Sequence, residues 1–288
     1  MIFLMHTKRF HYRNAVLIAL FFLFLCAITG ACVSSDIPAV SEGSDFNNSS
    51  DAISIEEIKD LLPIKIGYSS YPYPPLHYFE DNSLGDLQAI GFDIELAETV
   101  ARTINAEIEF LQIDWSKKAE MLISGEVDML WGGLAVDSLD ETKVKFTKPY
   151  LQSNIVLVMD AEDDYSSLED LHDLNICSLE FTPAADFFNF YDASIINSRQ
   201  AFITPIYKQL FTAVSLGKYD CIITDVSFAS FLCRITQHDY KISETIIESS
   251  YAVAVRVEDE ELFAKLQAAL DELDANGTIS RIAEKWIF

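Results

Sequence analysis

Residues 128–150 combine small, acidic and aromatic side chains in a pattern suited to binding a small molecule. A short apolar run ends in Gly132 and Gly133, where backbone N–H and C=O groups can approach a ligand closely because no side chain intervenes. A polar turn with three acids follows, namely Asp137, Asp140 and Glu141, and a Phe-x-x-Pro-Tyr segment then begins another apolar run. The layout predicts strand, loop and strand, and the alternative is an ordinary connection without a binding role.

Apolar runs of strand length alternate with helical stripes from about residue 63 to the end of the chain. Residues 64–66 and 108–110 have the pattern of strands, and between them an apolar residue recurs at helical spacing over residues 97–104. The alternation continues with predicted strands at 154–159, 175–179 and 219–224 and predicted helices at 184–191 and 205–216. This order predicts an α/β protein built from βαβ units with mostly parallel sheets. About 225 residues suffice for two lobes of around 100 each.

The first 31 residues have the features of a secretory signal peptide. They carry three basic residues and no acid, and residues 15–28 are uniformly apolar but too short for a spanning helix, which needs roughly 20 residues. The run ends in Thr-Gly-Ala-Cys, which predicts lipidation of Cys32, with simple cleavage or an uncleaved anchor as the alternatives. The polar composition of residues 32–62 then predicts a flexible tether, so that the protein is held extracytoplasmically on the membrane by its lipid.

The chain is strongly acidic, with a formal net charge of −25. Without residues 1–31 it retains 17 basic and 45 acidic residues, a net charge of −28. A chain this acidic should repel nucleic acid and anionic lipid head groups. Solubility, or a salty or acidic habitat, is the favoured explanation for most of the acidic surface. The cysteines beyond Cys32 are three, so that at most one disulfide can form among Cys177, Cys221 and Cys233. Neither these cysteines nor the isolated histidines have metal-site spacing, and we expect no metal and no cofactor.

Several short motifs occur in one order along the chain and together resemble a known family, the bacterial extracellular solute-binding proteins of family 3, which serve amino-acid ABC importers. They are Tyr73-Pro74-Pro75, Gly91-Phe92-Asp93, Ile113-Asp114-Trp115, the 128–150 segment, Thr224-Asp225, Asn276-Gly277-Thr278 and Glu284-Lys285-Trp286. The resemblance implies a two-lobed fold of the type 2 periplasmic binding proteins. Lobe 1 would comprise residues 63–152 and 250–288, and lobe 2 residues 153–249. Hinged closure around a solute would present a monomeric receptor to an ABC permease.

The resemblance also nominates residues that line the cleft. Tyr73 would stack on the ligand, with Trp115 and Trp131 as further aromatic contacts and Gly133 offering its backbone. Asp225 would bind the ligand's α-ammonium, although an acid after an apolar strand can equally cap the next helix.

The expected site for the ligand's α-carboxylate departs from the family pattern. Where the family has an arginine, this chain has Asp140, and Asp137 and Ala135 replace the usual threonine and serine. In lobe 2 the Gly-Thr-Thr pattern becomes Phe181-Thr182-Pro183, in which proline has no N–H and phenylalanine replaces the permissive glycine. A carboxylate beside these acids would be repelled and left without a partner.

These departures lead to the hypothesis of a small polar solute that is cationic or amine-bearing, since aromatic faces and acids both attract cations. Two alternatives remain. In the first, a lysine (Lys117, Lys118 or Lys143) supplies the missing positive charge from another position. In the second, the acids of the 128–150 segment lie in solvent outside the cleft.

Two other function classes share this architecture. A lyase resembling cyclohexadienyl dehydratase would need a positioned acid or base, for which Glu180 and Asp225 are the candidates, but no catalytic constellation is recognisable. A sensor domain would require a separate membrane signalling partner. We therefore expect a binding protein and not an enzyme.

Overall fold

The computed structural model of this 288-residue chain describes residues 62–81, 86–136, 138–165, 167, 169–172, 174–190, 200–236 and 239–288. The predicted signal peptide, Cys32, the tether up to residue 61 and Asp137 lie outside the described residues.

The first of two five-stranded sheets has the strand order β4-β1-β5-β14-β6. Its strands are β1 (Ile64–Ser69), β4 (Ile108–Ile113), β5 (Met129–Leu130), β6 (Val144–Phe146) and β14 (Ala254–Arg256). β1 pairs in parallel with β4 and β5, whereas β14 is antiparallel to β5 and β6. A small antiparallel hairpin, β2 (Tyr78–Asp81) and β3 (Leu87–Ile90), follows β1. β14, which comes from the last part of the chain, lies between β5 and β6 and so completes the five-stranded sheet.

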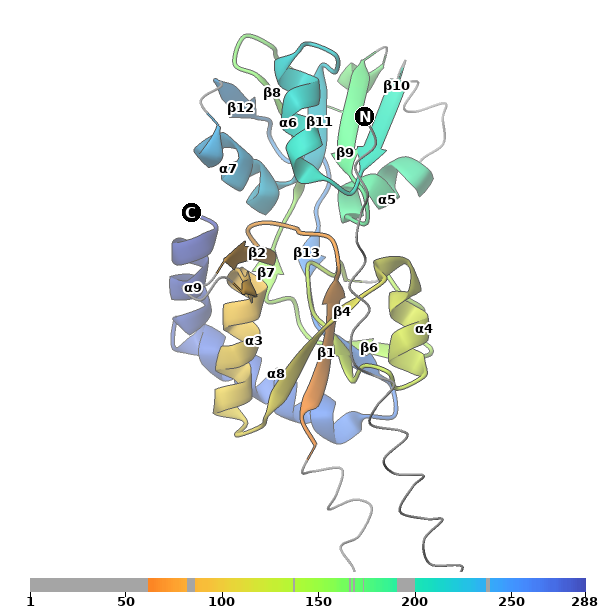
Figure 1. Cartoon of the computed structure of the whole chain (residues 1–288), viewed down its shortest axis with the longest axis vertical. Coiled ribbons are helices and arrows are strands. Elements are labelled where there is room, and N and C mark those ends of the chain that lie inside the picture. Colours follow the sequence, from red (N-terminus) through yellow and green to blue (C-terminus); the bar gives the residue numbers. More distant parts are fainter. Residues whose placement is uncertain are drawn as a thin grey trace, which may run out of the picture. The chain divides into compact units, whose positions relative to one another are not determined.

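Helices cover the first sheet as its crossovers require. α3 (Phe92–Thr103) connects β3 to β4, and η1 (Trp115–Lys117) with α4 (Lys118–Ile123) leads from β4 to β5. The two crossovers run in opposite directions across the sheet and so place their helices on opposite faces, α3 beside α8 and α9 and α4 apart from them (Figure 1). α8 (Glu260–Ala275) and α9 (Thr278–Trp286) pack on α3, where Lys285 and Trp286 both donate to Glu95 Oε2, at 2.5 and 2.7 Å.

The second sheet has the order β10-β9-β11-β8-β12. Its strands are β8 (Ile155–Asp160), β9 (Asn175–Leu179), β10 (Gln200–Thr204), β11 (Cys221–Asp225) and β12 (Tyr240–Ile242), with η2 (Glu169–Leu171) between β8 and β9. The helices are α5 (Pro183–Phe190), α6 (Tyr207–Ser215) and α7 (Val226–Ile235). β9 is parallel to β10 and β11, but β8 is antiparallel to β11 and β12. Both sheets are more antiparallel than the alternating pattern predicts. In each sheet the antiparallel strand is the first one after the chain arrives from the other sheet, β14 in the first and β8 in the second.

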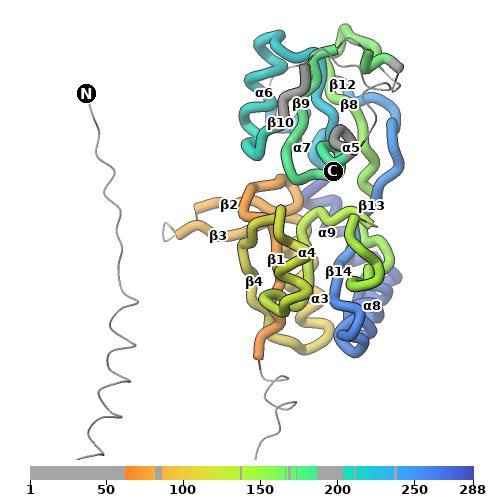
Figure 2. Tube along the Cα trace, turned by 90° about the vertical axis from the view of Figure 1, so that its right-hand side faces the viewer, coloured from red at the N-terminus to blue at the C-terminus, as the bar shows by residue number. Residues whose placement is uncertain are grey.

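The chain passes between the two sheets twice, and the two passages lie side by side. β7 (Leu151–Gln152) leads toward β8, and β13 (Ser250–Tyr251) leads back toward β14. β7 and β13 pair antiparallel, with Tyr251 opposite Leu151, and both views show this junction between the sheets (Figures 1 and 2). Two adjacent passages are the geometry of a hinge.

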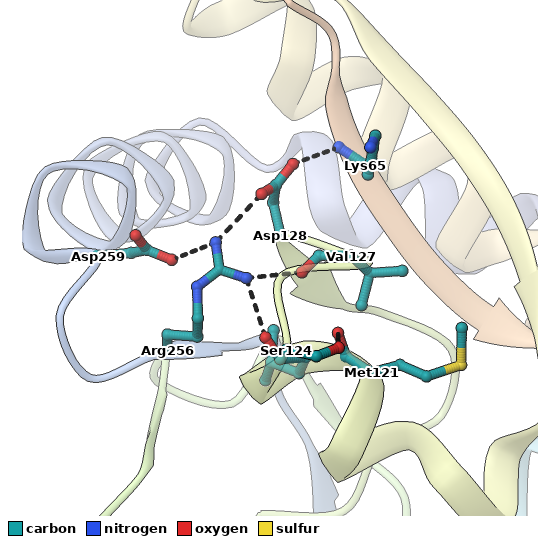
Figure 3. A network of polar contacts seen from close by, with 8 residues as sticks. Lys65, Met121, Ser124, Val127, Asp128, Arg256 and Asp259 are labelled. Carbon is teal, nitrogen blue, oxygen red and sulfur yellow. Dashed lines mark hydrogen bonds and ion pairs between the residues drawn. The ribbon is translucent and has the colours of Figure 1, made fainter. Parts of the chain in front are cut away.

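A buried arginine ties β14 to the rest of the first sheet (Figure 3). Arg256, only 8% exposed, forms ion pairs with Asp128 at 3.1 Å and Asp259 at 2.7 Å. It also donates to the carbonyls of Leu122 and Val127, at 2.9 and 2.7 Å. Asp128 in turn accepts from the backbone N–H of Lys65 at the start of β1. One guanidinium thus joins β14 to the segment between α4 and β5 and to β1.

Candidate functional site

A cleft lies where the carboxyl ends of strands from the two sheets meet, which is where open α/β sheets bind small molecules. In this structure its cavity volume is only about 10 Å³, room for about one water molecule, so a solute would require the sheets to move apart. The first sheet contributes residues that end or follow β1, β4 and β5, namely Ser69, Tyr71, Pro72, Tyr73, His77, Trp115 and Gly132. The second contributes residues that end or follow β9 and β10, namely Leu179, Glu180, Phe181, Thr182 and Pro205. Four predicted site residues, Tyr73, Trp115, Phe181 and Thr182, are among these.

Tyr73 is fixed in the cleft by a tight loop and by a glycine. Its backbone N–H donates to the carbonyl of His77 at 2.7 Å. A side chain at Gly133, which has φ 67°, would meet the Tyr73 ring at 2.8 Å, so both the backbone conformation and the close approach require glycine there. The Gly133 N–H donates to the buried carboxylate of Asp93 at 2.8 Å and is not directed into the cleft.

Asp225 ends β11 and begins α7, and its carboxylate is 1% exposed. Oδ1 accepts from Ser153 Oγ at 2.8 Å and from the backbone N–H groups of Ser227 and Phe228, at 3.0 and 3.1 Å. Oδ2 accepts the hydroxyl of Tyr73, which belongs to the first sheet. The helix cap is therefore present. Binding of a ligand's ammonium by Asp225 stays a prediction, and in this structure the acceptor is held by Tyr73.

Phe181 lies across the cleft from Tyr71, and the two rings stack with centroids 5.4 Å apart and planes 17° from parallel. Phe181 has φ 64°, the left-handed conformation that glycine adopts without strain. The hydroxyl of the next residue, Thr182, accepts from the Ala185 N–H at 3.3 Å, the hydrogen bond of a helix N-cap. Pro183 then occupies the first position of α5, where no N–H is needed. This corner of the cleft therefore presents an aromatic face where the family pattern has backbone N–H groups.

Trp115 is buried, and the ammonium of Lys118 lies 5.4 Å from its ring centroid. Burial lowers the pKa of Lys118, and the carboxylate of Asp186 on α5 opposes that shift. Lys118 does not line the cleft, but its ammonium lies over the ring of Trp115, which does. Of the other two candidates, Lys117 is exposed at the end of η1, and Lys143 is within 4.0 Å of Asp140 on an exposed turn.

The remaining predicted residues lie away from the cleft lining. Trp131 is 2% exposed and packs on the Tyr150 ring, with centroids 5.7 Å apart. Ala135 forms a bridge with Tyr251 of β13. Asp140 is exposed and accepts from the N–H and hydroxyl of Thr142, at 3.0 and 2.7 Å, which agrees with the alternative of a solvated turn. Asp137 is not among the described residues.

Tyr71, His77 and Glu180 are among the lining residues that were not predicted as ligand contacts. Buried His77 has its Nε2 at 3.1 Å from the carbonyl of Tyr71, and burial lowers its pKa to about 4, so the ring is neutral near pH 7. Glu180 directly precedes the altered Phe-Thr-Pro triplet, and that adjacency was the available signal.

Asp93, a buried acid in the first turn of α3, accepts the N–H of Gly133, the residue after the cleft-lining Gly132. Its Oδ1, the Trp131 Nε1 and the Tyr150 hydroxyl all lack a hydrogen-bond partner within the described part of the chain. Burial raises the pKa of Asp93 to about 7, although the nearby Tyr150 hydroxyl, the Gly133 N–H and the Trp131 indole oppose the rise.

Replacing Asp93 by asparagine should therefore change how stability depends on pH. An acid with a pKa near 4 when unfolded and about 7 when folded binds more protons in the folded state, so the free energy of unfolding falls as pH rises through this window. Between pH 5 and 8 the wild type should lose about 2–3 kcal/mol relative to Asp93→Asn. Urea unfolding of both proteins at the two pH values measures this difference. A difference that does not vary with pH would contradict the assignment.

Two mixed sheets, two adjacent passages and a cleft at the strand ends define a two-lobed binding protein, with lobes built around the first and second sheets. Residues 64–288 match the model of the bacterial extracellular solute-binding proteins, family 3, and the chain belongs to this family. It is 25% identical over 218 residues to the glutamate-binding protein GluB of Corynebacterium glutamicum, covering 70% of each chain. It is 23% identical to the arginine-binding extracellular protein ArtP of Bacillus subtilis, covering 76% of this chain and 84% of ArtP.

A solved structure supports the fold. The amino-acid ABC transporter substrate-binding protein AbpA of Streptococcus pneumoniae, bound to L-arginine, superposes with a TM-score of 0.68 at 22% identity, over 80% of this chain and 97% of AbpA. The family assignment confirms the resemblance read from the motifs and the expectation of an extracellular binding protein and not an enzyme. None of the helices described is long and apolar enough to cross a membrane. The described residues include no group of three or more His, Cys, Asp or Glu suited to a metal.

Proposed function

We propose that this chain is the receptor component of an ABC importer and that its solute is small and carries a positively charged amine. The observation that carries this proposal is the charge of the cleft. Among the described lining residues Glu180 is the only acid, and none is lysine or arginine. The rings of Tyr71, Trp115 and Phe181 lie around the same space, and each aromatic face attracts a cation by about 0.5–2 kcal/mol.

The relatives support an amino-acid-like solute. The two named above are described as binding glutamate and arginine, and the histidine-binding periplasmic protein of Escherichia coli is 26% identical over 217 residues. All three amino acids carry an α-ammonium, but they differ in the charge of the side chain. An arginine-like or diamine solute agrees best with a cleft that offers acceptors and aromatic faces.

Calorimetric titration of the mature protein with L-arginine, L-histidine, L-glutamate, putrescine and choline tests this proposal. We expect binding of one or more of the cations and no measurable binding of L-glutamate. Preferential binding of L-glutamate would overturn the cationic assignment. In that case Lys118, beside Trp115 and opposite Asp186, becomes the candidate carboxylate partner, and Lys118→Ala should abolish the binding.

Glu180→Gln should weaken binding of the cationic solute about tenfold, because a carboxylate that faces a bound cation contributes on the order of 1–2 kcal/mol in a partly enclosed site. The amide keeps the size of the side chain, so the midpoint of urea unfolding should not move. Glu98→Gln on the exposed face of α3 is the matched control and should leave affinity unchanged. Equal affinities of the two variants would exclude Glu180 from the site.

Export and anchoring form the second part of the proposal, supported by the sequence of residues 1–32. The basic start, the short apolar run and Cys32 favour a lipoprotein signal. Cys32→Ser should move the protein from the membrane fraction of the producing cell to the soluble extracytoplasmic fraction. Unchanged membrane association would exclude lipidation at Cys32.

A further inference from the structure

A buried chain of hydroxyl groups joins both interlobe passages to one carboxylate. Tyr73 from the loop after β1 donates to Asp225 Oδ2 in the second lobe, and its hydroxyl oxygen is 2.9 Å from that of Tyr251 on β13. Ser153, directly after β7, donates to the other oxygen of Asp225 at 2.8 Å. All four residues are at most 5% exposed. The first lobe and both passages therefore converge on Asp225.

The number of protons on each group determines which hydroxyl donates in this chain of hydroxyl groups. A tyrosine hydroxyl has one proton, and in Tyr73 it is directed to a carboxylate, which can only accept. Tyr251 must then donate to the Tyr73 oxygen. Burial and the neighbouring Asp225 hold the pKa of Tyr73 well above its ordinary value, so it stays a donor.

We propose that the Tyr73 hydroxyl is an internal substitute for the ammonium of the solute, bound to the same Asp225 oxygen that the solute needs. This Tyr73–Asp225 latch rests on the proposed function for the nature of the solute, but the interlobe contact stands independently of it. A neutral hydroxyl-bearing solute that displaced Tyr73 would exchange one hydroxyl–carboxylate bond for another and gain nothing. An ammonium gains, because it adds Coulomb attraction between opposite charges to the hydrogen bond, and this attraction is stronger in a buried site than in water. The latch thus sets the threshold that a solute must exceed.

The latch has an opposite effect on closure and on affinity. It joins the lobes and so favours the closed state. It also raises the apparent dissociation constant of the solute, because only unlatched molecules can bind it, and the rise equals the inverse of the unlatched fraction. Tyr73→Phe keeps the aromatic ring and removes only the hydroxyl. It should open the lobes of the free protein and tighten the binding of a cation, here by about tenfold for a latch of ordinary buried hydrogen-bond strength.

The experiment has two arms on the mature protein. Small-angle X-ray scattering without added solute should give a larger radius of gyration for Tyr73→Phe than for wild type. Calorimetry with L-arginine and with putrescine should give a dissociation constant about tenfold lower for Tyr73→Phe. Tyr251→Phe is the matched control, because it removes the neighbouring hydroxyl but leaves the Tyr73–Asp225 bond, and it should change either readout much less.

The outcomes separate the latch from the proposed function. Weaker binding by Tyr73→Phe would show that the hydroxyl contacts the solute and would overturn the latch, as would identical scattering of variant and wild type. If neither probe binds the wild type, the scattering arm alone decides: a more open Tyr73→Phe supports the latch, and an unchanged one rejects it.

Discussion

Replacement of Arg256 by alanine is expected to lower the free energy of unfolding by about 3–5 kcal/mol, the loss typical of removing one partner from a buried ion-pair network. The carboxylates of Asp128 and Asp259 would lose the guanidinium that pairs with both, and two carbonyls would lose their donor. For a protein of this size the midpoint of thermal unfolding should fall by roughly 10 °C. Thermal and urea unfolding followed by circular dichroism measure both quantities.

The matched control is an exposed ion pair in the same lobe. Lys148 lies 2.9 Å from Asp271, and both side chains are about half exposed or more. Lys148→Ala should lower stability by less than about 1 kcal/mol, because water replaces an exposed pair readily. If Arg256→Ala proved as mild as this control, the network of Figure 3 would not be what holds β14 in the sheet.

Replacement of Asp225 by alanine is the second large effect, because this carboxylate serves a helix cap, an interlobe contact and the predicted ammonium site. Four donors would lose their acceptor, and we expect a loss of stability on the order of 3–5 kcal/mol together with loss of measurable solute binding. Urea unfolding and calorimetry with L-arginine and putrescine test the two parts.

Asp225→Asn separates the structural role of this residue from its charge. Asparagine caps helices about as well as aspartate, so most of the stability lost in Asp225→Ala should be retained. The amide carries no charge, and affinity for a cationic solute should still fall about 100-fold, or roughly 2.7 kcal/mol. Wild-type affinity in Asp225→Asn would mean that the solute's positive charge is held elsewhere, with Glu180 as the alternative.

The fold was predictable where local pattern decides it. Apolar periodicity placed β1, β4, β8 and β9 and the helices α5 and α6 within a few residues of their observed ends. The pairing of distant segments was not readable in this way. β14 inserts between β5 and β6, and β8 runs antiparallel beside β11, because long-range packing chooses among strands that look alike in sequence.

The site was predictable where a residue is fixed by a motif. Tyr73 and Asp225 were expected on opposite sides of a cleft, and the structure brings their side chains into contact. Asp140 was placed by counting along the same segment, yet its carboxylate binds Thr142 two residues later in an exposed turn. Such a local hydrogen bond competes with any role in the cleft. Tyr71 was missed because it lies in an aromatic and proline-rich loop, where the spacing of residues does not reveal which side chains face the cleft.

The return of the chain through β13 has a consequence for how the protein is made. Strand β14 and helices α8 and α9 come from the last 40 or so residues, yet they complete the lobe that begins with β1. The second lobe is continuous in sequence and has all its strands once residue 242 has emerged. During vectorial synthesis and export the later lobe can therefore assemble first, while the earlier one waits with exposed strand edges for the C-terminal segment.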